Sequence, residues 1–458
     1  MKLLVVSNNY LQKSIISSKR WRCFSKYLSR LGHEVIVICG DDDSYSDELF
    51  SIEELQNANL KILKYGTTEF LFSFLLKIIR LIRGRKKNIT QGGNITSSYL
   101  YLHPMSWYSY TKSYFLCWLE TKIYELFSLS RFRHSQILRK IENEKFDCII
   151  ASCGPLDSII IGEKIHKCFN KIPYYVEFRD MLHSRAYLNK AQNDFFINYE
   201  KKHVSLSSGT FVVSNGQKSM LSEAIGANLN VMDKIFVLYH GFEFSELKKE
   251  SNILDNSSKL TITYTGTLDP AVENPEMLFH AISDLINERL INKENIQFIY
   301  AGLGVEYFEA VAAKYQLEKN VLYVGFVSPS ESLQYQREAD ILLLLTDNSL
   351  YQRGILGGKF SEYLYASKPI ISLSVGNLAD AEISNLIKNM HIGIACEYVK
   401  YEESLLSLKE EFLCMYSQKM NLNKIDYNPK KNLIMDFSYE CLTSKLISIL
   451  ENNVGKHK

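Results

Sequence analysis

The sequence predicts an α/β protein built from two doubly wound parallel sheets. Short apolar runs rich in β-branched residues alternate with longer stretches of helical periodicity, which is the pattern of parallel strands joined by crossover helices. A polar segment at 246–259 interrupts this alternation, which then restarts. With 458 residues, 46% of them apolar, the chain can fill two hydrophobic cores of ordinary size.

The predicted strands form one set on each side of the polar segment. The first set lies at 3–6, 35–39, 148–151, 174–178, 210–213 and 236–239, and the second at 260–264, 296–301, 321–324, 341–345 and 370–373. We therefore expect a first domain at 1–245, with an insertion at about 66–135, and a second domain at 260–430. The final segment, 431–458, has apolar positions at helical spacing over 437–450 and is expected to return to the first domain as a packed helix.

The composition excludes several classes of protein. The 53 basic and 51 acidic residues give a formal charge of +2, so no overall field indicates a nucleic-acid partner. The nine cysteines contain no CxxC pair, which argues against a disulfide framework and a zinc cluster and fits a cytoplasmic location. Isolated histidines without HxxxH or HExxH spacing predict no bound metal ion, and no cofactor is expected.

The segment 354–364, GILGGKFSEYL, carries the strongest chemical signal. Gly357 and Gly358 let the backbone approach a ligand, and the amides of a helix that begins there can bind phosphate oxygens. Lys359 adds a positive charge, and Glu362, one turn later, can accept hydrogen bonds from the paired hydroxyls of a ribose. The alternative is a turn followed by an exposed ion pair between Lys359 and Glu362.

This segment and its surroundings resemble the retaining GT-B glycosyltransferases of group 1 (family 4), especially capsule and O-antigen members. Their G-K-x-x-E-Y-L-x-x-x-K-P signature is matched at 358–364 and 368–369. Further matches are GHEV at 32–35, YTGTL at 264–268, AGLG at 301–304 and VGFV at 324–327.

The resemblance implies two Rossmann-like domains facing across a cleft and a UDP- or GDP-linked sugar as donor. Lys359 would hold the donor diphosphate and Glu362 the ribose. The donor-binding positions implied by the resemblance are Gly266, Thr267, Gly302, Gly304, Val327, Gly357, Gly358, Lys359, Phe360 and Glu362.

The chain departs from the family pattern at three positions. Gly354 stands where many members have a second glutamate, and Thr267 replaces an arginine. Glu273 is followed by Asn274 where a lysine is often found. The diphosphate would then depend on Lys359 together with backbone amides or another basic residue such as Arg353.

The acceptor side is expected in the first domain. The sequence VEFRD at 176–180 resembles the family's D-x-R-D, which makes Arg179 and Asp180 catalytic candidates; a buried structural ion pair is an equal alternative. By the same resemblance Lys19 and Arg20 would face the acceptor, although a basic pair at a helix start is often simply solvated. Ser152 ends the preceding strand and is expected to line the cleft on the acceptor side.

A basic amphipathic helix is predicted at 70–87, followed by aromatic residues between 107 and 118. Both features suit peripheral contact with the inner face of the cell membrane, and ordinary packing against the first sheet is an equal alternative. Membrane contact would favour a polyprenyl-diphosphate-linked glycan as acceptor, as the resemblance also suggests.

The sequence thus predicts a metal-independent transferase that acts with retention of configuration in bacterial surface-polysaccharide synthesis. Two alternatives stay open: a catalytically inactive scaffold on the same fold, suggested by Gly354, and a sugar-nucleotide epimerase.

Overall fold

The computed structural model describes residues 1–12, 16–41, 59–66, 105–169, 171–185, 187–243 and 259–454. The predicted basic helix at 70–87 lies outside these residues. The chain divides into two compact units, the first comprising Met1–Tyr239 with Leu442–Lys458 and the second His240–Cys441.

The first unit contains a seven-stranded parallel sheet in the order β3-β2-β1-β4-β5-β6-β7. Its strands are β1 (Lys2–Val6), β2 (Glu34–Gly40), β3 (Leu60–Tyr65), β4 (Cys148–Cys153), β5 (Tyr174–Phe178), β6 (Gly209–Val212) and β7 (Ile235–Val237). Its helices are α1 (Ile16–Arg30), α4 (Trp107–His134), α5 (Ile137–Ile141), α6 (Asp157–Cys168), α7 (Lys190–Leu206), α8 (Asn215–Ile225) and α9 (Leu229–Met232), and α17 (Tyr439–Val454) joins them from Leu442 onward.

The second unit contains a six-stranded parallel sheet in the order β10-β9-β8-β11-β12-β13. Its strands are β8 (Leu260–Thr265), β9 (Ile296–Ala301), β10 (Val321–Gly325), β11 (Ile341–Asp347), β12 (Ile370–Val375) and β13 (Gly393–Glu397). Its helices are α10 (Glu276–Asn287), α11 (Val305–Lys314), α12 (Pro329–Glu338), α13 (Gly358–Ala366), α14 (Glu382–Met390), α15 (Tyr401–Leu422) and α16 (Lys431–Met435), with single 3₁₀ turns at Lys293–Asn295, Glu318–Asn320 and Tyr398–Lys400.

In each sheet the first strand lies in the middle and the next two strands extend the sheet to one edge. The chain then crosses back, and the remaining strands extend the sheet to the other edge. The chain reverses direction between β1 and β4 in the first sheet and between β8 and β11 in the second. Ligands of such sheets bind beyond the carboxyl ends of the strands at this reversal. The prediction of two doubly wound parallel sheets is confirmed.

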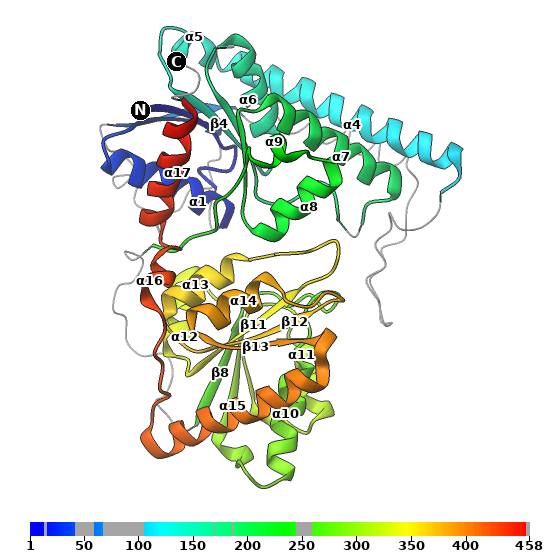
Figure 1. Cartoon of the computed structure of the whole chain (residues 1–458), viewed down its shortest axis with the longest axis vertical. Coiled ribbons are helices and arrows are strands. Elements are labelled where there is room, and N and C mark those ends of the chain that lie inside the picture. Colours follow the sequence, from blue (N-terminus) through cyan, green and yellow to red (C-terminus); the bar gives the residue numbers. More distant parts are fainter. Residues whose placement is uncertain are drawn as a thin grey trace. The chain divides into compact units, whose positions relative to one another are not determined.

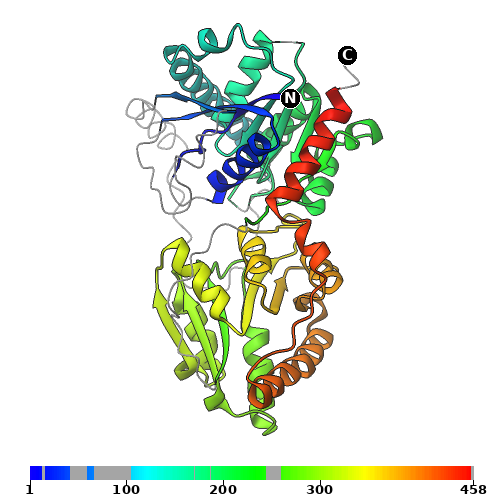
Figure 2. The same cartoon turned by 90° about the vertical axis from the view of Figure 1, so that its left-hand side faces the viewer.

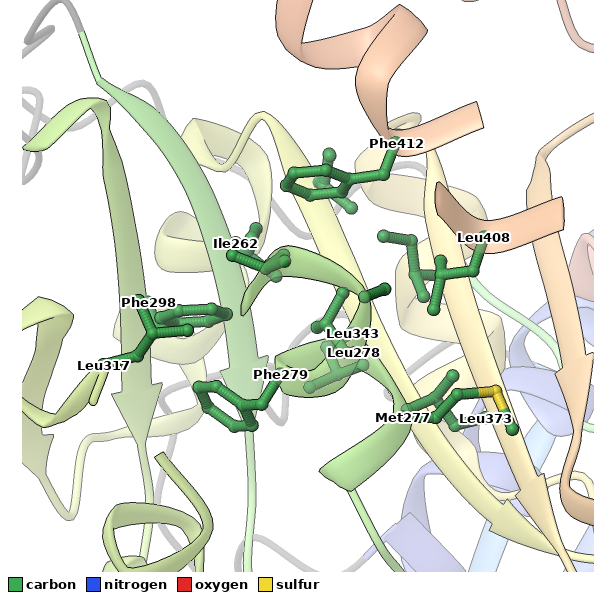
Figure 3. Packing of buried hydrophobic residues seen from close by; sticks show 14 of the residues in the cluster. Ile262, Met277, Leu278, Phe279, Phe298, Leu317, Leu343, Leu373, Leu408 and Phe412 are labelled. Atoms are coloured by element: carbon green, nitrogen blue, oxygen red, sulfur yellow. The ribbon is translucent and has the colours of Figure 1, made fainter. Parts of the chain in front are cut away.

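The core of the second unit forms because its four inner strands are almost entirely buried while its long helices are apolar on one side. Helices α10 and α15 lie side by side on the sheet (Figure 1). Figure 3 shows Phe279 of α10 against Phe298 of β9, with ring centroids 4.6 Å apart, and Leu408 and Phe412 of α15 closing the same cluster. Burying such side chains stabilises by roughly 1.5 to 3 kcal/mol each, so this layer holds the strand ends in place.

Helices α17 and α4 contribute further apolar packing to the first unit. Helix α17, drawn in red in Figure 1 and Figure 2, buries Leu442, Leu446 and Leu450, which recur every four residues on one face. Helix α4 packs against α7, where the Tyr114 ring meets Phe195 edge-on at 5.5 Å. None of the helices in the described segments has an apolar stretch of the length and purity that a bilayer crossing requires.

Candidate functional site

Two glycines at the carboxyl ends of β8 and β9 bring the backbone of the second unit close to Lys359. Gly266 has φ +116° and its N–H donates to Ala301 O at 2.8 Å. A Cβ at Gly266 would lie 2.5 Å from Cε of Lys359, and a Cβ at Gly302, where φ is +155°, would lie 2.0 Å from the carbonyl oxygen of Gly266. Only glycine fits both positions, because any side chain would displace the lysine or the neighbouring strand end.

Helix α13 begins at Gly358 immediately after β11 and the loop that follows it. Its N-cap is Gly357, whose backbone is extended and which has no side chain to cap the first turn. Gly357 is exposed. The first N–H groups of a helix are unsatisfied within the helix and carry partial positive charge, so this end can receive an anion beside Lys359.

Lys359 is the only predicted donor-binding residue that carries a positive charge. Its Nζ donates to the phenolic oxygen of Tyr264 at 2.6 Å and lies 3.7 Å from Oε1 of Glu273. Burial lowers the pKa of Lys359 below its ordinary value of 10.5, and the carboxylates of Glu273 and Glu362 oppose this shift only in part. The alternative of an exposed ion pair with Glu362 is not formed among the described residues, where Lys359 pairs with Glu273.

Glu273 is held rigidly in the loop between β8 and α10. Its Oε2 accepts hydrogen bonds from the Asp269 amide at 2.9 Å and from the Tyr264 hydroxyl at 3.1 Å. Burial and the Glu273 carboxylate raise the pKa of Tyr264 far above its usual value, so the phenol stays neutral and links the acid to the lysine.

Glu362 is oriented by a buried glutamine. Nε2 of Gln336, on α12, donates at 3.0 Å to Oε2 of Glu362 and lies 3.0 Å from the hydroxyl of Thr265 at the end of β8. Glu362 is half-buried, and its Oε1 has no hydrogen-bond partner in the part of the chain that the structure describes. One carboxylate oxygen is thus fixed while the other can accept from a ligand hydroxyl.

The other predicted donor-binding residues are spread around this group. Gly304 (φ +79°) begins α11, close to Leu268 of the loop after β8, and Thr267 is exposed in that loop. Val327 is half-buried and packs against the second face of the sheet. Phe360 is a correction to the predicted ligand contacts: its side chain is 1% exposed and packs on Phe437 at 5.7 Å, so its ring belongs to the core.

In the first unit a buried carboxylate contacts two of the three predicted acceptor-side residues. Glu177, in β5, accepts from Nε of Arg20 at 2.8 Å and from Ser152 at 2.6 Å. Trp21 donates to the same carboxylate at 2.7 Å. Burial would raise the pKa of Glu177, but Arg20, Arg179 and Ser152 outweigh burial and hold it below its usual value.

Arg20 is fully buried, so the alternative of a solvated basic pair is wrong for it. Besides Glu177 it contacts the backbone oxygens of Leu238 and Tyr239 at 2.8 and 2.6 Å. Its contacts are those of a structural ion pair, and Ser152, 1% exposed, belongs to the same cluster. Lys19 is half-buried on α1, and its acceptor-side role stays a prediction.

Arg179 and Asp180 directly follow β5 and lie in different surroundings. Arg179 is 5% exposed and donates to the backbone oxygens of Cys153 at 3.1 Å and Gly154 at 2.8 Å. Asp180 is exposed and lines a pocket next to Gly154 and Pro155. The alternative of an Arg179–Asp180 ion pair is not formed in the described segments, where the Arg179 guanidinium donates to these two backbone oxygens.

The sequence did not single out Tyr264 or Gln336, and it noted Glu273 only as a departure from the family pattern. Tyr264 belongs to the YTGTL segment but read as a strand residue, and Gln336 lies in a polar helix with no recognisable motif. The described residues contain no group of three or more His, Cys, Asp or Glu side chains placed to hold a metal ion.

Comparison with known proteins finds a family match in the second unit. Residues 259–394 match the family model described as glycosyl transferases group 1. No curated protein sequence matches the chain significantly.

Several solved structures are similar over nearly the whole chain. Sucrose-phosphate synthase from Thermosynechococcus elongatus is 12% identical, with 99% of this chain and 98% of that chain covered and a TM-score of 0.59. The catalytic domain of starch synthase IV from Arabidopsis thaliana, bound to ADP and acarbose, is 12% identical, with 99% of each chain covered and a TM-score of 0.56. A trehalose-6-phosphate structure from E. coli, bound with UDP-2-fluoro glucose, is 11% identical, with 98% and 99% covered and a TM-score of 0.57. At these identities the likeness establishes the fold, which is GT-B.

Proposed function

We propose that this chain transfers a sugar from a UDP- or GDP-linked donor to a glycan acceptor, with retention of anomeric configuration and without a metal ion. One observation carries the proposal: the half-buried ammonium of Lys359 stands beside the uncapped start of α13 and the two strand-end glycines. A diphosphate is the group that such a cation and such amides suit best.

The proposed roles of Lys359 and α13 follow from where negative charge develops during the reaction. As the bond between the sugar and the nucleotide breaks, negative charge grows on the departing diphosphate, and Lys359 with the α13 amides would stabilise it. The open oxygen of Glu362 would accept from a ribose hydroxyl and fix the nucleotide. The resemblance to retaining members, and the ADP and UDP-sugar bound in two similar structures, support this assignment.

The acceptor is proposed to be lipid-linked and reached at the membrane surface, with the protein in the cytoplasm. Helix α4 supports this because four of its aromatic residues point outward: Trp107, Tyr108, Phe115 and Trp118 are 80%, 73%, 54% and 41% exposed. Exposed aromatic rings of this kind favour the headgroup zone of a bilayer. Such an acceptor fits surface-polysaccharide synthesis.

Vesicle binding tests the membrane part. Vesicles that contain phosphatidylglycerol should co-sediment the protein, and the variant Trp107→Ser/Trp118→Ser should bind several-fold less. If this variant binds the vesicles as well as the wild-type protein does, α4 is not the element that contacts the membrane.

Donor binding tests the central part. A thermal-shift screen of UDP-, GDP- and ADP-sugars should reveal one stabilising donor, and NMR of the product should show the donor's anomeric configuration. Glu362→Ala should abolish donor binding while the fold persists, whereas Glu309→Ala, an exposed carboxylate of α11, should behave as wild type. Unaltered turnover by Glu362→Ala would overturn the assignment.

A catalytically silent scaffold is the second candidate, and the carboxylate of Glu273 beside Lys359 favours it. A scaffold need bind no nucleotide, so absence of UDP and GDP binding would decide for it. An epimerase would instead convert the donor without any acceptor.

A further inference from the structure

The first unit contains a pocket of about 540 Å³ between α4 and α7, at the carboxyl ends of β4 and β5. All the described residues that line it belong to that unit. Its volume is that of an ordinary small-molecule site.

The walls of the pocket are mainly apolar. Tyr124 of α4, Leu182 and Leu188 of the loop after β5, and Phe196 of α7 line it. Leu182 and Leu188 are 7% and 4% exposed, so these walls are packed from behind. A ligand with an apolar face fits such walls better than a ligand that is polar on all sides.

The polar groups of the pocket carry both signs of charge. Asp180 and Glu120 contribute two carboxylates and Arg185 one guanidinium. The described lining residues therefore carry a net negative charge, which disfavours a phosphate or any other anion. Carboxylates and a guanidinium at one site instead suit hydroxyl groups, since carboxylates accept hydrogen bonds and Arg donates them.

Two of these groups are placed to act on a ligand. Arg185 donates from Nε to Met181 O at 3.0 Å and from Nη1 to the Tyr187 hydroxyl at 2.8 Å, which fixes its plane. Asp180 makes no hydrogen bond or ion pair within the described segments, and it is the residue that the sequence selected as a catalytic candidate. The Tyr187 ring is 64% exposed at the same edge and can cover the apolar face of a sugar ring.

We propose that this pocket binds a neutral sugar unit, with Asp180 accepting from its hydroxyls and Arg185 donating to them. The assignment of this sugar unit as the acceptor rests on the proposed function. If the acceptor is lipid-linked, the pocket takes the sugar end and excludes the phosphate end.

Ligand-observed NMR tests the proposal with methyl glycosides of glucose, galactose, mannose and N-acetylglucosamine, and with inorganic phosphate as the anionic probe. At least one glycoside should bind the wild-type protein, and phosphate should not compete with it. Asp180→Asn and Arg185→Gln should each weaken glycoside binding about tenfold, as loss of a charged hydrogen bond does.

Two exposed residues of the same unit provide matched controls. Asp233→Asn and Arg139→Gln remove the same charges outside the pocket and should leave glycoside binding unchanged. Absence of glycoside binding, competition by phosphate, or unchanged binding in both pocket variants would overturn the proposal.

The outcome is separable from that of the proposed function. UDP and GDP titrations of the wild-type protein report on the second unit alone. Glycoside binding without nucleotide binding would leave the pocket intact and refute the transferase, whereas the reverse would refute only the pocket.

Discussion

The ammonium group of Lys359 donates a 2.6 Å hydrogen bond to Tyr264, and the carboxylate of Glu273 lies 3.7 Å from the same nitrogen. Glu273 thus occupies the neighbourhood in which a phosphate oxygen of a donor would pair with the lysine. The positive charge is balanced before any donor arrives, so a bound diphosphate must take over the contact that Glu273 makes.

Replacing Glu273 with Gln should strengthen UDP or GDP binding. The change removes a negative charge beside the diphosphate while preserving an acceptor for the Asp269 amide and the Tyr264 hydroxyl. A partly screened charge pair is worth roughly 1 to 2 kcal/mol, so calorimetry should show about tenfold tighter binding. Glu309→Gln is the control, and weaker binding by Glu273→Gln would contradict the account.

Nucleotide affinity should fall at alkaline pH. Binding needs the protonated lysine, and burial lowers the pKa of Lys359 below 10.5. The decline therefore begins at a lower pH than for an ordinary lysine. In Glu273→Gln it should begin lower still, because a carboxylate that favours the charged form is gone. Calorimetric titrations between pH 7 and 10 give the pH at which nucleotide affinity has fallen halfway in the wild-type protein and in Glu273→Gln. If this pH is the same in the two proteins, Glu273 does not control the protonation of Lys359.

The buried pair of Glu177 and Arg20 should be structural. Glu177→Gln leaves the fully buried Arg20 without its counterion, and breaking such a pair costs about 3 to 5 kcal/mol. Chemical unfolding of the first unit should show this loss, while Arg20→Met/Glu177→Leu should recover part of it because no charge remains unpaired. Loss of sugar transfer with unchanged stability would point instead to a direct catalytic role.

Asp347 at the end of β11 should destabilise the second unit at neutral pH. Burial raises its pKa from 3.8 to about 6, against the opposing hydrogen bonds of Ser349 and nearby amides. The folded state therefore binds more protons than the unfolded state between these values, and stability falls as pH rises from about 4 to 6. Asp347→Asn should raise the unfolding free energy at pH 7.5 by on the order of 1 to 2 kcal/mol, and less at pH 5. The exposed Asp426→Asn should show no such difference.

The strands of both sheets were predictable wherever they are buried on both sides. All eleven predicted runs coincide with strands. Nine of them are inner strands, whose burial on both faces makes them largely apolar, whereas β7 and β10 are edge strands that keep short apolar runs. The two strands that the sequence did not reveal, β3 and β13, are edge strands of their sheets. In β3 the lysines at 61 and 64 face outward and break the apolar run, as edge positions allow.

Only those donor-site residues that lie close together in the sequence were predictable. Gly357, Gly358, Lys359 and Glu362 lie within six residues of one another, so a single motif identifies them. Tyr264 and Gln336 reach the same place from other elements, and only the sheet order brings them there. The buried pairing of Arg20 with Glu177 likewise joins residues 157 apart in sequence, which no local pattern can show.

The most direct test of the account is calorimetric titration of the wild-type protein and Lys359→Met with UDP and GDP, with the exposed Lys319→Met as control. One nucleotide should bind the wild-type and Lys319→Met proteins at one site each. Lys359→Met should bind it at least about tenfold more weakly, since a charge-assisted contact to phosphate is lost. Equal binding by Lys359→Met, or no nucleotide binding by the wild-type protein, would contradict the claim that Lys359 holds a donor diphosphate.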